Sequence, residues 1–467
     1  MNKPEEQYPY SEIVQRYKKM LKADKHVYFD ISELEEIIDY FLEKQDFEGC
    51  EKAISYARRL HKHSTELSLK KAQLLIDKQD YNQAESLLVE LSSSMGGKPD
   101  LYFLYGYMYV KTDRLEDAAE AFAQFVHLTS DKKAESHSSV AFTYVQAGYY
   151  DEAVSHLKQA EKADPESSYV LYESAYCYEK IGDFEKSIHY YEQFLKEQPF
   201  SSNVWYNLGL VYELDQKPEK AIEAYDFALA LKPKFELAHS NKGNVELSEG
   251  KYGNALQTFE NLLKFYPSSK AAFSGVADAY RFMADYEQAL EYYYKALKID
   301  KYYLPTIYGI ALVYFEKDNN FEGLNYVLRA LKQDKNNPNY NFLAGLFFDR
   351  LEYFDKAEVA FVKSLEADPF RPQVWISFSD IYVETEAEKA IKLLVEAGSI
   401  LPESEDIFYR LTAIYYQLKK YEKAEQTLRT ALNINEDRLA EFLEEFPQIR
   451  KVERLKKLTD TKNMNLE

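Results

Sequence analysis

Apolar and small residues in the stretch from Ser202 to Phe235 fall into two groups, each with the spacing of a helix face. Counted from Ser202 as position 1, they occupy positions 4, 7, 8 and 11, then 20, 24 and 27: Trp205, Leu208, Gly209, Tyr212, Ala221, Tyr225 and Ala228. Spacings of three, four and seven residues place side chains on one side of an α-helix. Pro218 suits the first turn of a helix and Pro233 ends one. The pattern therefore predicts two short helices joined by a turn.

The same template fits the chain in steps of 34 residues, with one residue inserted near Lys133 and one missing after Tyr382. Position 20 is small in all twelve units: Cys50, Ala84, Ala118, Ala153, Ser187, Ala221, Ala255, Ala289, Gly323, Ala357, Ala390 and Ala424. Position 8 is small in ten units and position 11 is aromatic in ten. A small residue lets two helices approach closely, which a bulky side chain would prevent. We therefore expect repeated helical hairpins that bury their apolar faces against one another.

Turn residues mark the middle and the end of each unit. Glycines at position 15 predict a left-handed residue after the first helix, as in Gly148, Gly182 and Gly250. Prolines recur at position 32, where one unit passes into the next, as in Pro165, Pro199 and Pro233.

This pattern resembles the tetratricopeptide repeat family, whose 34-residue unit carries W-x2-L-G-x2-Y, then A-x3-F and P. The segments WYNLGLVYE and AIEAYDFALALKP carry the resemblance. It implies an all-α solenoid, a right-handed superhelix with a concave groove lined mainly by the first helix of each unit. We expect an N-terminal segment with a cap helix in residues 1–30, twelve repeats in 31–438, and a capping helix with a basic tail in 439–467.

Composition narrows the choice of partners. A formal net charge of −20 argues against duplex nucleic acid or an anionic membrane as the main partner, although an acidic surface also simply aids solubility. The chain shows no apolar run typical of a signal peptide or of a membrane span, so membrane insertion is not expected. Only two cysteines are present, Cys50 and Cys177, which favours core thiols in a reducing cytoplasm.

The sequence lacks the motifs on which catalysis usually depends. It has no glycine-rich phosphate loop, no HExxH, no GxSxG and no clustered cysteines. We therefore expect neither an enzyme nor a cofactor. His61 and His63 form the only close histidine pair along the chain, and two histidines alone make a poor metal site.

The candidate binding residues come from the expected groove. The resemblance implies that positions 2, 5, 6, 9 and 12 of each first helix face it, and many of these are aromatic. An amide cluster lies among them, and asparagine amides can hold the backbone of an extended peptide. The predicted peptide-binding residues are Tyr172, Tyr176, Asn203, Tyr206, Asn207, Asn241 and Asn244. The alternative interpretation is that the rings pack against the next first helix and that the asparagines are ordinary repeat residues.

Two hypotheses for function remain. The first is a protein-interaction scaffold that binds an extended or helical segment of a partner in its groove. The second is a structural subunit that joins a larger assembly through its convex face or its ends. Family members that capture chaperone C-termini use a set of lysine, asparagine and arginine that no three consecutive units provide here. Arg410 is an isolated match, so capture of a C-terminal carboxylate is not expected.

Overall fold

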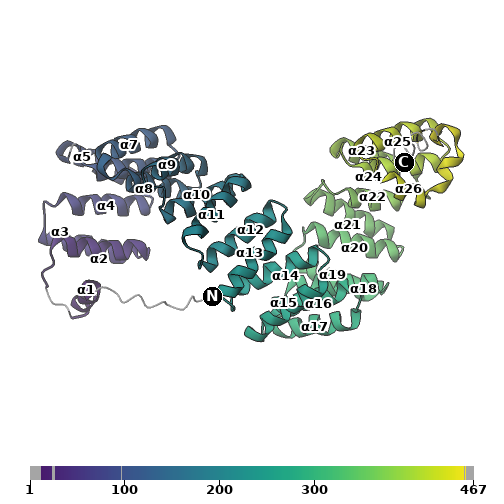
Figure 1. Cartoon of the computed structure of the whole chain (residues 1–467), viewed down its shortest axis with the longest axis horizontal. Helices are drawn as coiled ribbons and strands as arrows, with labels where there is room; N and C mark the ends of the chain where they lie inside the picture. The colour runs from purple at the N-terminus through teal and green to yellow at the C-terminus, as the bar shows by residue number, and fades with distance from the viewer. Residues whose placement is uncertain (1–11, 24–26, 96, 457, 459–467) are drawn as a thin grey trace. The chain divides into compact units, whose positions relative to one another are not determined.

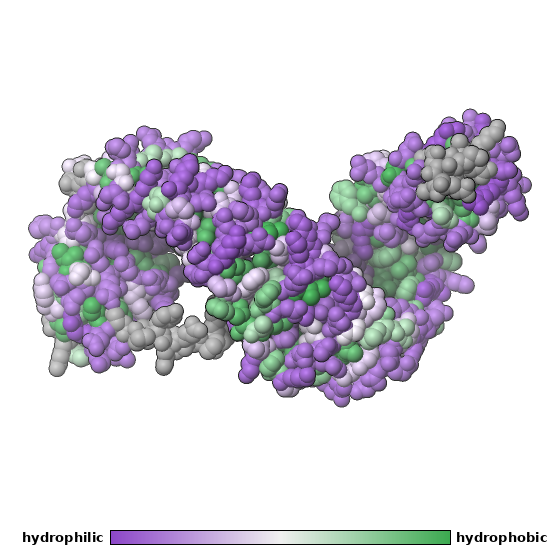
Figure 2. Space-filling model, in the orientation of Figure 1, coloured by the Kyte–Doolittle hydropathy of each residue, from purple (hydrophilic) through white to green (hydrophobic). Residues whose placement is uncertain are grey.

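The computed structural model describes residues 12–23, 27–95, 97–456 and 458, and within these ranges every regular element is a helix (Figure 1). It divides into two compact units, Met1–Pro233 and Lys234–Glu467, each of which holds six helical hairpins among its described residues. Hydrophilic residues predominate on the surface seen in Figure 2, with hydrophobic residues in scattered patches. No helix in the described ranges combines the length and apolar content needed to cross a membrane.

In the first unit, helix α1 (Glu12–Ala23) precedes the hairpins. The first helices of the hairpins are α2 (Ile31–Glu43), α4 (Thr65–Asp77), α6 (Pro99–Lys111), α8 (Lys133–Ala147), α10 (Ser168–Ile181) and α12 (Ser202–Leu214). The second helices are α3 (Phe47–Leu60), α5 (Tyr81–Met95), α7 (Leu115–Leu128), α9 (Tyr150–Ala163), α11 (Phe184–Glu197) and α13 (Pro218–Leu231). A short 3-10 turn, η1 (Ser130–Lys132), accommodates the inserted residue before α8.

In the second unit, the first helices are α14 (Glu236–Ser248), α16 (Lys270–Phe282), α18 (Leu304–Glu316), α20 (Pro338–Arg350), α22 (Pro372–Asp380) and α24 (Glu405–Gln417). The second helices are α15 (Tyr252–Phe265), α17 (Tyr286–Ile299), α19 (Asn320–Gln333), α21 (Phe354–Ala367), α23 (Ala387–Ile400) and α25 (Tyr421–Ile434). The chain then continues into α26 (Leu439–Glu445) and η2 (Pro447–Lys451). Within each unit, a second helix contacts both its own first helix and the next one.

An aromatic ring on the second helix explains why the first helix needs a small residue. In four hairpins the ring at position 24 lies against a glycine at position 8. A Cβ added to this glycine would lie only 2.4–2.5 Å from the nearest ring atom. The four pairs are Phe122 with Gly106, Tyr225 with Gly209, Phe259 with Gly243 and Phe361 with Gly345. The Phe259 ring also touches Gly275 of the next first helix, at 2.4 Å from that residue's ideal Cβ. One ring thus joins two consecutive hairpins.

We predict opposite effects for two alanine substitutions in the same hairpin. Gly243→Ala forces a methyl group into the Phe259 ring and should destabilise the hairpin by about 1–3 kcal/mol. Gly253→Ala adds a methyl group where no other atom lies within 4 Å, and should stabilise helix α15 by about 0.5 kcal/mol. Hydrogen exchange of peptides from α14 and α15 measures both effects, and equal protection in the two variants would contradict the ring contact.

The hairpin turns confirm the predicted left-handed residue at position 15. Gly148 and Gly182 have φ of 86° and 87°, and Gly250 has φ of 70°. Other hairpins place a residue with a side chain in the same conformation, including Asp113 and Ala284. The residue missing after Tyr382 has a visible effect, because α22 ends after nine residues where the other first helices have thirteen or more.

Terminal helices cover the ends of the described chain. Tyr17 on α1 is fully buried and meets the rings of Phe29, Phe41 and Tyr56 edge-on at 6.0–6.1 Å between centroids. At the other end, Phe442 and Leu443 on α26 are buried in the cluster that contains the last hairpin. Both helices hide apolar surface that the first and last hairpins would otherwise expose.

Candidate functional site

The predicted site begins on α10 and α12, where Tyr172 and Asn207 contact each other. The Asn207 amide donates a hydrogen bond of 3.1 Å to the Tyr172 hydroxyl, which links two consecutive first helices. The Tyr172 ring packs edge-on against Tyr191 and Phe194 of α11, with centroids 5.9 and 6.2 Å away. Both residues are only partly buried, so part of each side chain also faces solvent.

The other predicted residues of the first unit differ in exposure. Asn203 is exposed, and Tyr206 is partly buried beside the Tyr225 ring at 5.8 Å. Tyr176 is partly buried, and its ring lies 5.0 Å below the Lys180 ammonium. These rings therefore pack on neighbouring helices on one side and reach solvent on the other.

The remaining two predicted residues belong to the second unit. On α14, Asn244 is exposed and Asn241 is partly buried. The structure brings Tyr172 and Asn207 into contact, and the combined action of all seven residues as one site stays a prediction.

We use the name first-helix face for the surface formed by positions 2, 5, 6, 9 and 12 of the first helices. Several pairs of consecutive first helices contact each other within each unit, including α4 with α6, α6 with α8 and α14 with α16. Two of its aromatic residues are exposed, Phe142 with 49% of its surface in solvent and Tyr169 with 41%. Rings exposed to this extent offer planar contact area to a partner at a low entropic cost.

At the C-terminal end, the chain itself covers the first-helix face. Tyr409 of α24 is 5% exposed because Phe442 of α26 lies over it, with ring centroids 4.8 Å apart. The Tyr409 hydroxyl donates to the carbonyl of Asn435 at 3.1 Å, and the Tyr416 hydroxyl donates to the carbonyl of Gln448 at 3.0 Å. Tyr409 occupies position 5 of its unit, a position expected to line an open groove, and it instead contacts a helix of the same chain.

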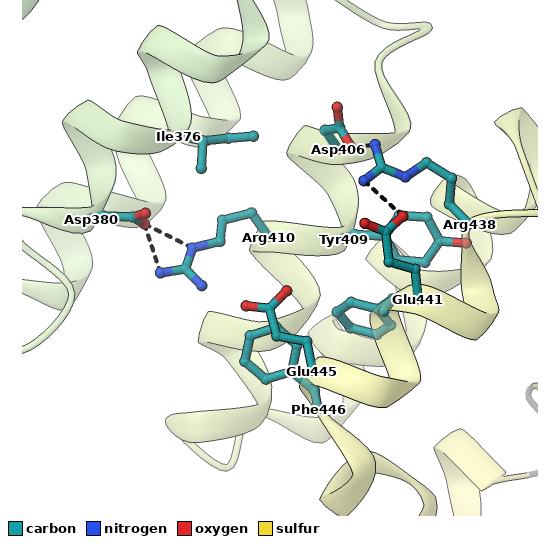
Figure 3. A pocket seen from close by; sticks show the side chains of 10 residues that line it. Ile376, Asp380, Asp406, Tyr409, Arg410, Arg438, Glu441, Glu445 and Phe446 are labelled. Carbon is teal, nitrogen blue, oxygen red and sulfur yellow. Dashed lines mark hydrogen bonds and ion pairs between the residues drawn. The ribbon is translucent and has the colours of Figure 1, made fainter. Parts of the chain in front are cut away.

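A cavity of about 210 Å³ lies beside this helix (Figure 3), and we call it the α24–α26 pocket. Its lining comes from α22, α24, α26 and the residues directly before and after α26: Ile376, Asp380, Asp406, Tyr409, Arg410, Arg438, Glu441, Phe442, Glu445 and Phe446. The lining therefore combines an apolar and aromatic floor with six charged groups.

The two arginines of the pocket are held by carboxylates. Arg410 bonds one oxygen of Asp380 through Nε at 2.8 Å and Nη2 at 2.7 Å. Arg438 contacts Asp406 and lies 3.2 Å from Glu441. Burial raises the pKa of both Asp380 and Asp406 above the ordinary value, and the neighbouring arginine opposes this rise in each case. In both cases the effect of burial outweighs the attraction of the arginine.

A second cavity lies in the first unit, on the side where the second helices α11 and α13 are exposed. It measures about 420 Å³ and is lined by second helices α11 and α13 over a floor from α12: Glu192, Leu195, Lys196, Trp205, Leu208, Tyr212, Lys220, Glu223, Ala224 and Phe227. Trp205 stacks on Phe227 with centroids 4.5 Å apart, and Phe227 is 53% exposed. We call this cavity the α11–α13 groove.

The described residues contain no group of three or more His, Cys, Asp or Glu side chains that could hold a metal ion. The thiols of Cys50 and Cys177 are buried, and burial raises the pKa of each to about 12. A thiol with so high a pKa is a poor nucleophile and a poor ligand at neutral pH. These side chains are core residues, as the repeat positions predict.

Sequence reasoning missed both cavities, since neither has a motif. The lining of the α24–α26 pocket spans residues 376 to 446 and assembles only when α26 folds back on α24. The one available signal was Arg410, an arginine on the first-helix face whose partner could not be read from the sequence.

Comparisons with known proteins agree with this architecture. Three family models described as tetratricopeptide repeat match residues 69–133, 143–188 and 178–234, residues 384–444, and residues 272–303, which together make up just over half of the chain. The chain belongs to the tetratricopeptide repeat family. Members of this family generally mediate protein–protein interactions and are generally non-catalytic. No curated protein matches the chain.

Several solved structures are similar to this chain. A tetratricopeptide repeat protein from Parabacteroides merdae is 17% identical, with 54% of this chain and 99% of that chain covered and a TM-score of 0.48. Yeast Tom70 is 14% identical, with 84% and 98% covered and a TM-score of 0.46. The Cut9–Hcn1 structure of the APC/C gives 13% identity, 92% coverage of both chains and a TM-score of 0.42.

Proposed function

We propose that this tetratricopeptide repeat protein is a cytoplasmic scaffold that holds an extended or helical segment of a partner protein along its first-helix face. The observation that carries the proposal is the position of α26 on α24. There, a helix of this chain lies on first-helix aromatics, and two tyrosine hydroxyls donate to its neighbouring backbone carbonyls. A partner segment would use the same contacts on the hairpins that α26 leaves open.

The chemistry of the face suits such a ligand. Rings such as Phe142 and Tyr169 provide apolar contact, and exposed amides such as Asn203 and Asn244 can donate to and accept from a peptide backbone. Asn207 has a further structural contact, because its amide positions Tyr172. The net charge of −20 supports a protein partner over nucleic acid.

The test compares partner capture by three forms of the intact protein. In the first variant, Phe142→Ala and Tyr169→Ala remove two exposed rings of the first-helix face, and in the second, Asn203→Ala and Asn244→Ala remove the two exposed amides. The third, Phe227→Ala, removes an exposed ring of the α11–α13 groove and is the matched control. We expect the ring variant to lower capture of a specific partner about tenfold or more, since each large ring can contribute over 1 kcal/mol. We expect Phe227→Ala to retain it.

The opposite result would favour a second candidate function. The α11–α13 groove is an apolar cavity on the second-helix side, and such a surface fits a structural subunit that joins an assembly through its convex face. If Phe227→Ala abolishes capture and the first-helix variants do not, the scaffold proposal fails in favour of this one. Circular dichroism of each variant verifies that the helices are intact.

A further inference from the structure

We propose that the α24–α26 pocket binds the cationic side chain of a lysine or arginine carried by the partner segment. This proposal rests on the scaffold function and adds the chemistry that one position of the bound segment must have. Three properties of the pocket support it: its charge balance, the shape of its lining and its place at the end of the open first-helix face.

The charge balance leaves room for a cation. The lining contains two arginines and four carboxylates. Arg410 is engaged by Asp380, and Arg438 is shared between Asp406 and Glu441. Glu445 is exposed, and the structure gives it no ion pair within the described residues. Figure 3 shows its carboxylate directed toward the same space as the Arg410 guanidinium, with no ion pair drawn between the two groups.

The lining also suits the alkyl stem of such a side chain. Ile376 is on one wall, and the ring of Phe442 on α26 lies 5.3 Å from the ring of Phe446, which follows this helix. Long basic side chains lay their methylene groups along apolar surface and keep the charged end at polar groups. A cation near an aromatic ring gains further attraction from its π-electrons. A lysine or arginine can satisfy both parts of this lining at once.

An anionic ligand fits less well. Both arginines already donate to carboxylates, so an anion would displace an internal carboxylate or lie beside unpaired ones. The chain as a whole, with a net charge of −20, attracts cationic segments and repels acidic ones. The charges of the pocket and the net charge of the chain therefore both favour a positively charged ligand.

The pocket lies at the open edge of the segment that α26 covers. Ile376 and Asp380 belong to α22, the first helix immediately before α24, and occupy positions 5 and 9 of its hairpin. A partner segment lying along the first-helix face would reach the end of α26 at this point. The basic side chain would then anchor one end of the bound segment.

The experiment observes the Ile376 methyl group by NMR in the full-length protein labelled at isoleucine Cδ1, with Ile376→Val assigning the signal. The probe is the blocked tripeptide acetyl-Leu-Arg-Leu-amide, and its matched controls replace arginine by citrulline, which is similar in shape and uncharged, or by glutamate. We expect the arginine peptide to shift the Ile376 signal in a saturable way. We expect the citrulline peptide to bind at least about threefold more weakly, as loss of a partly exposed ion pair implies.

Two variants test the role of the carboxylates. The double substitution Glu441→Gln and Glu445→Gln should weaken binding of the arginine peptide about tenfold, because it removes an unpaired carboxylate and one of the two carboxylates that neutralise Arg438. Glu444→Gln is the matched control, since this residue is exposed, lies next to Glu445 and does not line the pocket. It should leave the affinity unchanged.

The outcomes separate this proposal from the scaffold function. No shift at Ile376, equal binding of the citrulline peptide, or equal affinity in the double variant would overturn the pocket assignment. If capture of a partner depends on Phe142 and Tyr169 but is the same in the Glu441→Gln and Glu445→Gln protein, the scaffold function stands and the pocket assignment fails. If the arginine peptide binds as expected, but the ring and amide variants of the first-helix face capture the partner as well as the native protein does, the pocket assignment stands and the scaffold function fails.

Discussion

Phe259→Ala is expected to destabilise the hairpin of α14 and α15 and its contact with α16 by about 3–5 kcal/mol. The Phe259 ring is 2% exposed and fills the space beside Gly243 of its own hairpin and Gly275 of the next. Neither glycine can extend a side chain into the cavity, so the gap cannot close by local rearrangement. Helices α14 to α16 should therefore lose hydrogen-exchange protection together.

The matched control for this prediction is Phe265→Ala on the same helix. Its ring is 37% exposed, and truncation should cost under about 1 kcal/mol. Because repeat proteins open locally, exchange must be followed peptide by peptide rather than as one global transition. Equal loss of protection in the two variants, or a loss confined to α15 in Phe259→Ala, would contradict the role of the ring as a link between hairpins.

The second large effect is expected at the histidine pair of α8 and α9. His137 is 8% exposed and its Nδ1 lies 3.0 Å from Nδ1 of His156, so one ring donates and the other accepts. Burial lowers the pKa of His156 from 6.5 to about 4, and burial together with Lys133 lowers the pKa of His137. Lys133 and Tyr144 on α8 lie near the pair, and Glu152 on α9 interacts with Tyr144.

The sign of the pH effect follows from these shifts. The unfolded chain binds protons at these histidines at a higher pH than the folded chain does, so stability falls as pH falls from about 6.5 to 4. For His156 alone, the loss is on the order of 3 kcal/mol. The His156→Phe variant should be less sensitive to acid than the native chain over this range when the exchange of α8 and α9 is measured.

The control for the histidine prediction is His189→Gln, which changes an exposed imidazole on α11. It should leave the pH dependence of α8 and α9 in place, whereas His156→Phe reduces it. Carboxylates also titrate in this range, and they contribute equally to the native chain and the variants. If His156→Phe and the native chain lose protection in parallel between pH 6.5 and 4, the pair does not control acid stability.

The sequence predicted the hairpins because each depends on contacts that recur at a fixed spacing. A ring at position 24 needs a small residue at position 8, and both positions are visible in the sequence, as in Tyr225 and Gly209. The left-handed turn residue is equally local. The repeat pattern therefore carries most of the information that folds one hairpin against the next.

The candidate site was less predictable, because its contacts join helices that have no fixed spacing. The prediction that Asn207 faces a peptide did not include the hydrogen bond that its amide donates to Tyr172, and part of its side chain still faces solvent. The sequence of α26 indicated a capping helix but did not show which residues it would cover. The pairing of Arg410 with Asp380, and the pocket beside it, follow only from that placement.

The ring that links two hairpins also bears on how such chains change length during evolution. Phe259 lies against Gly275, and one repeat later Tyr293 lies against Gly309 in the same manner. If unequal recombination removed residues 270–303, Phe259 would meet Gly309, again an aromatic ring opposite a glycine. A gene encoding this chain can thus lose or duplicate one unit and still place an aromatic ring against a glycine at the new junction. The number of repeats can therefore change while this contact between consecutive hairpins is kept.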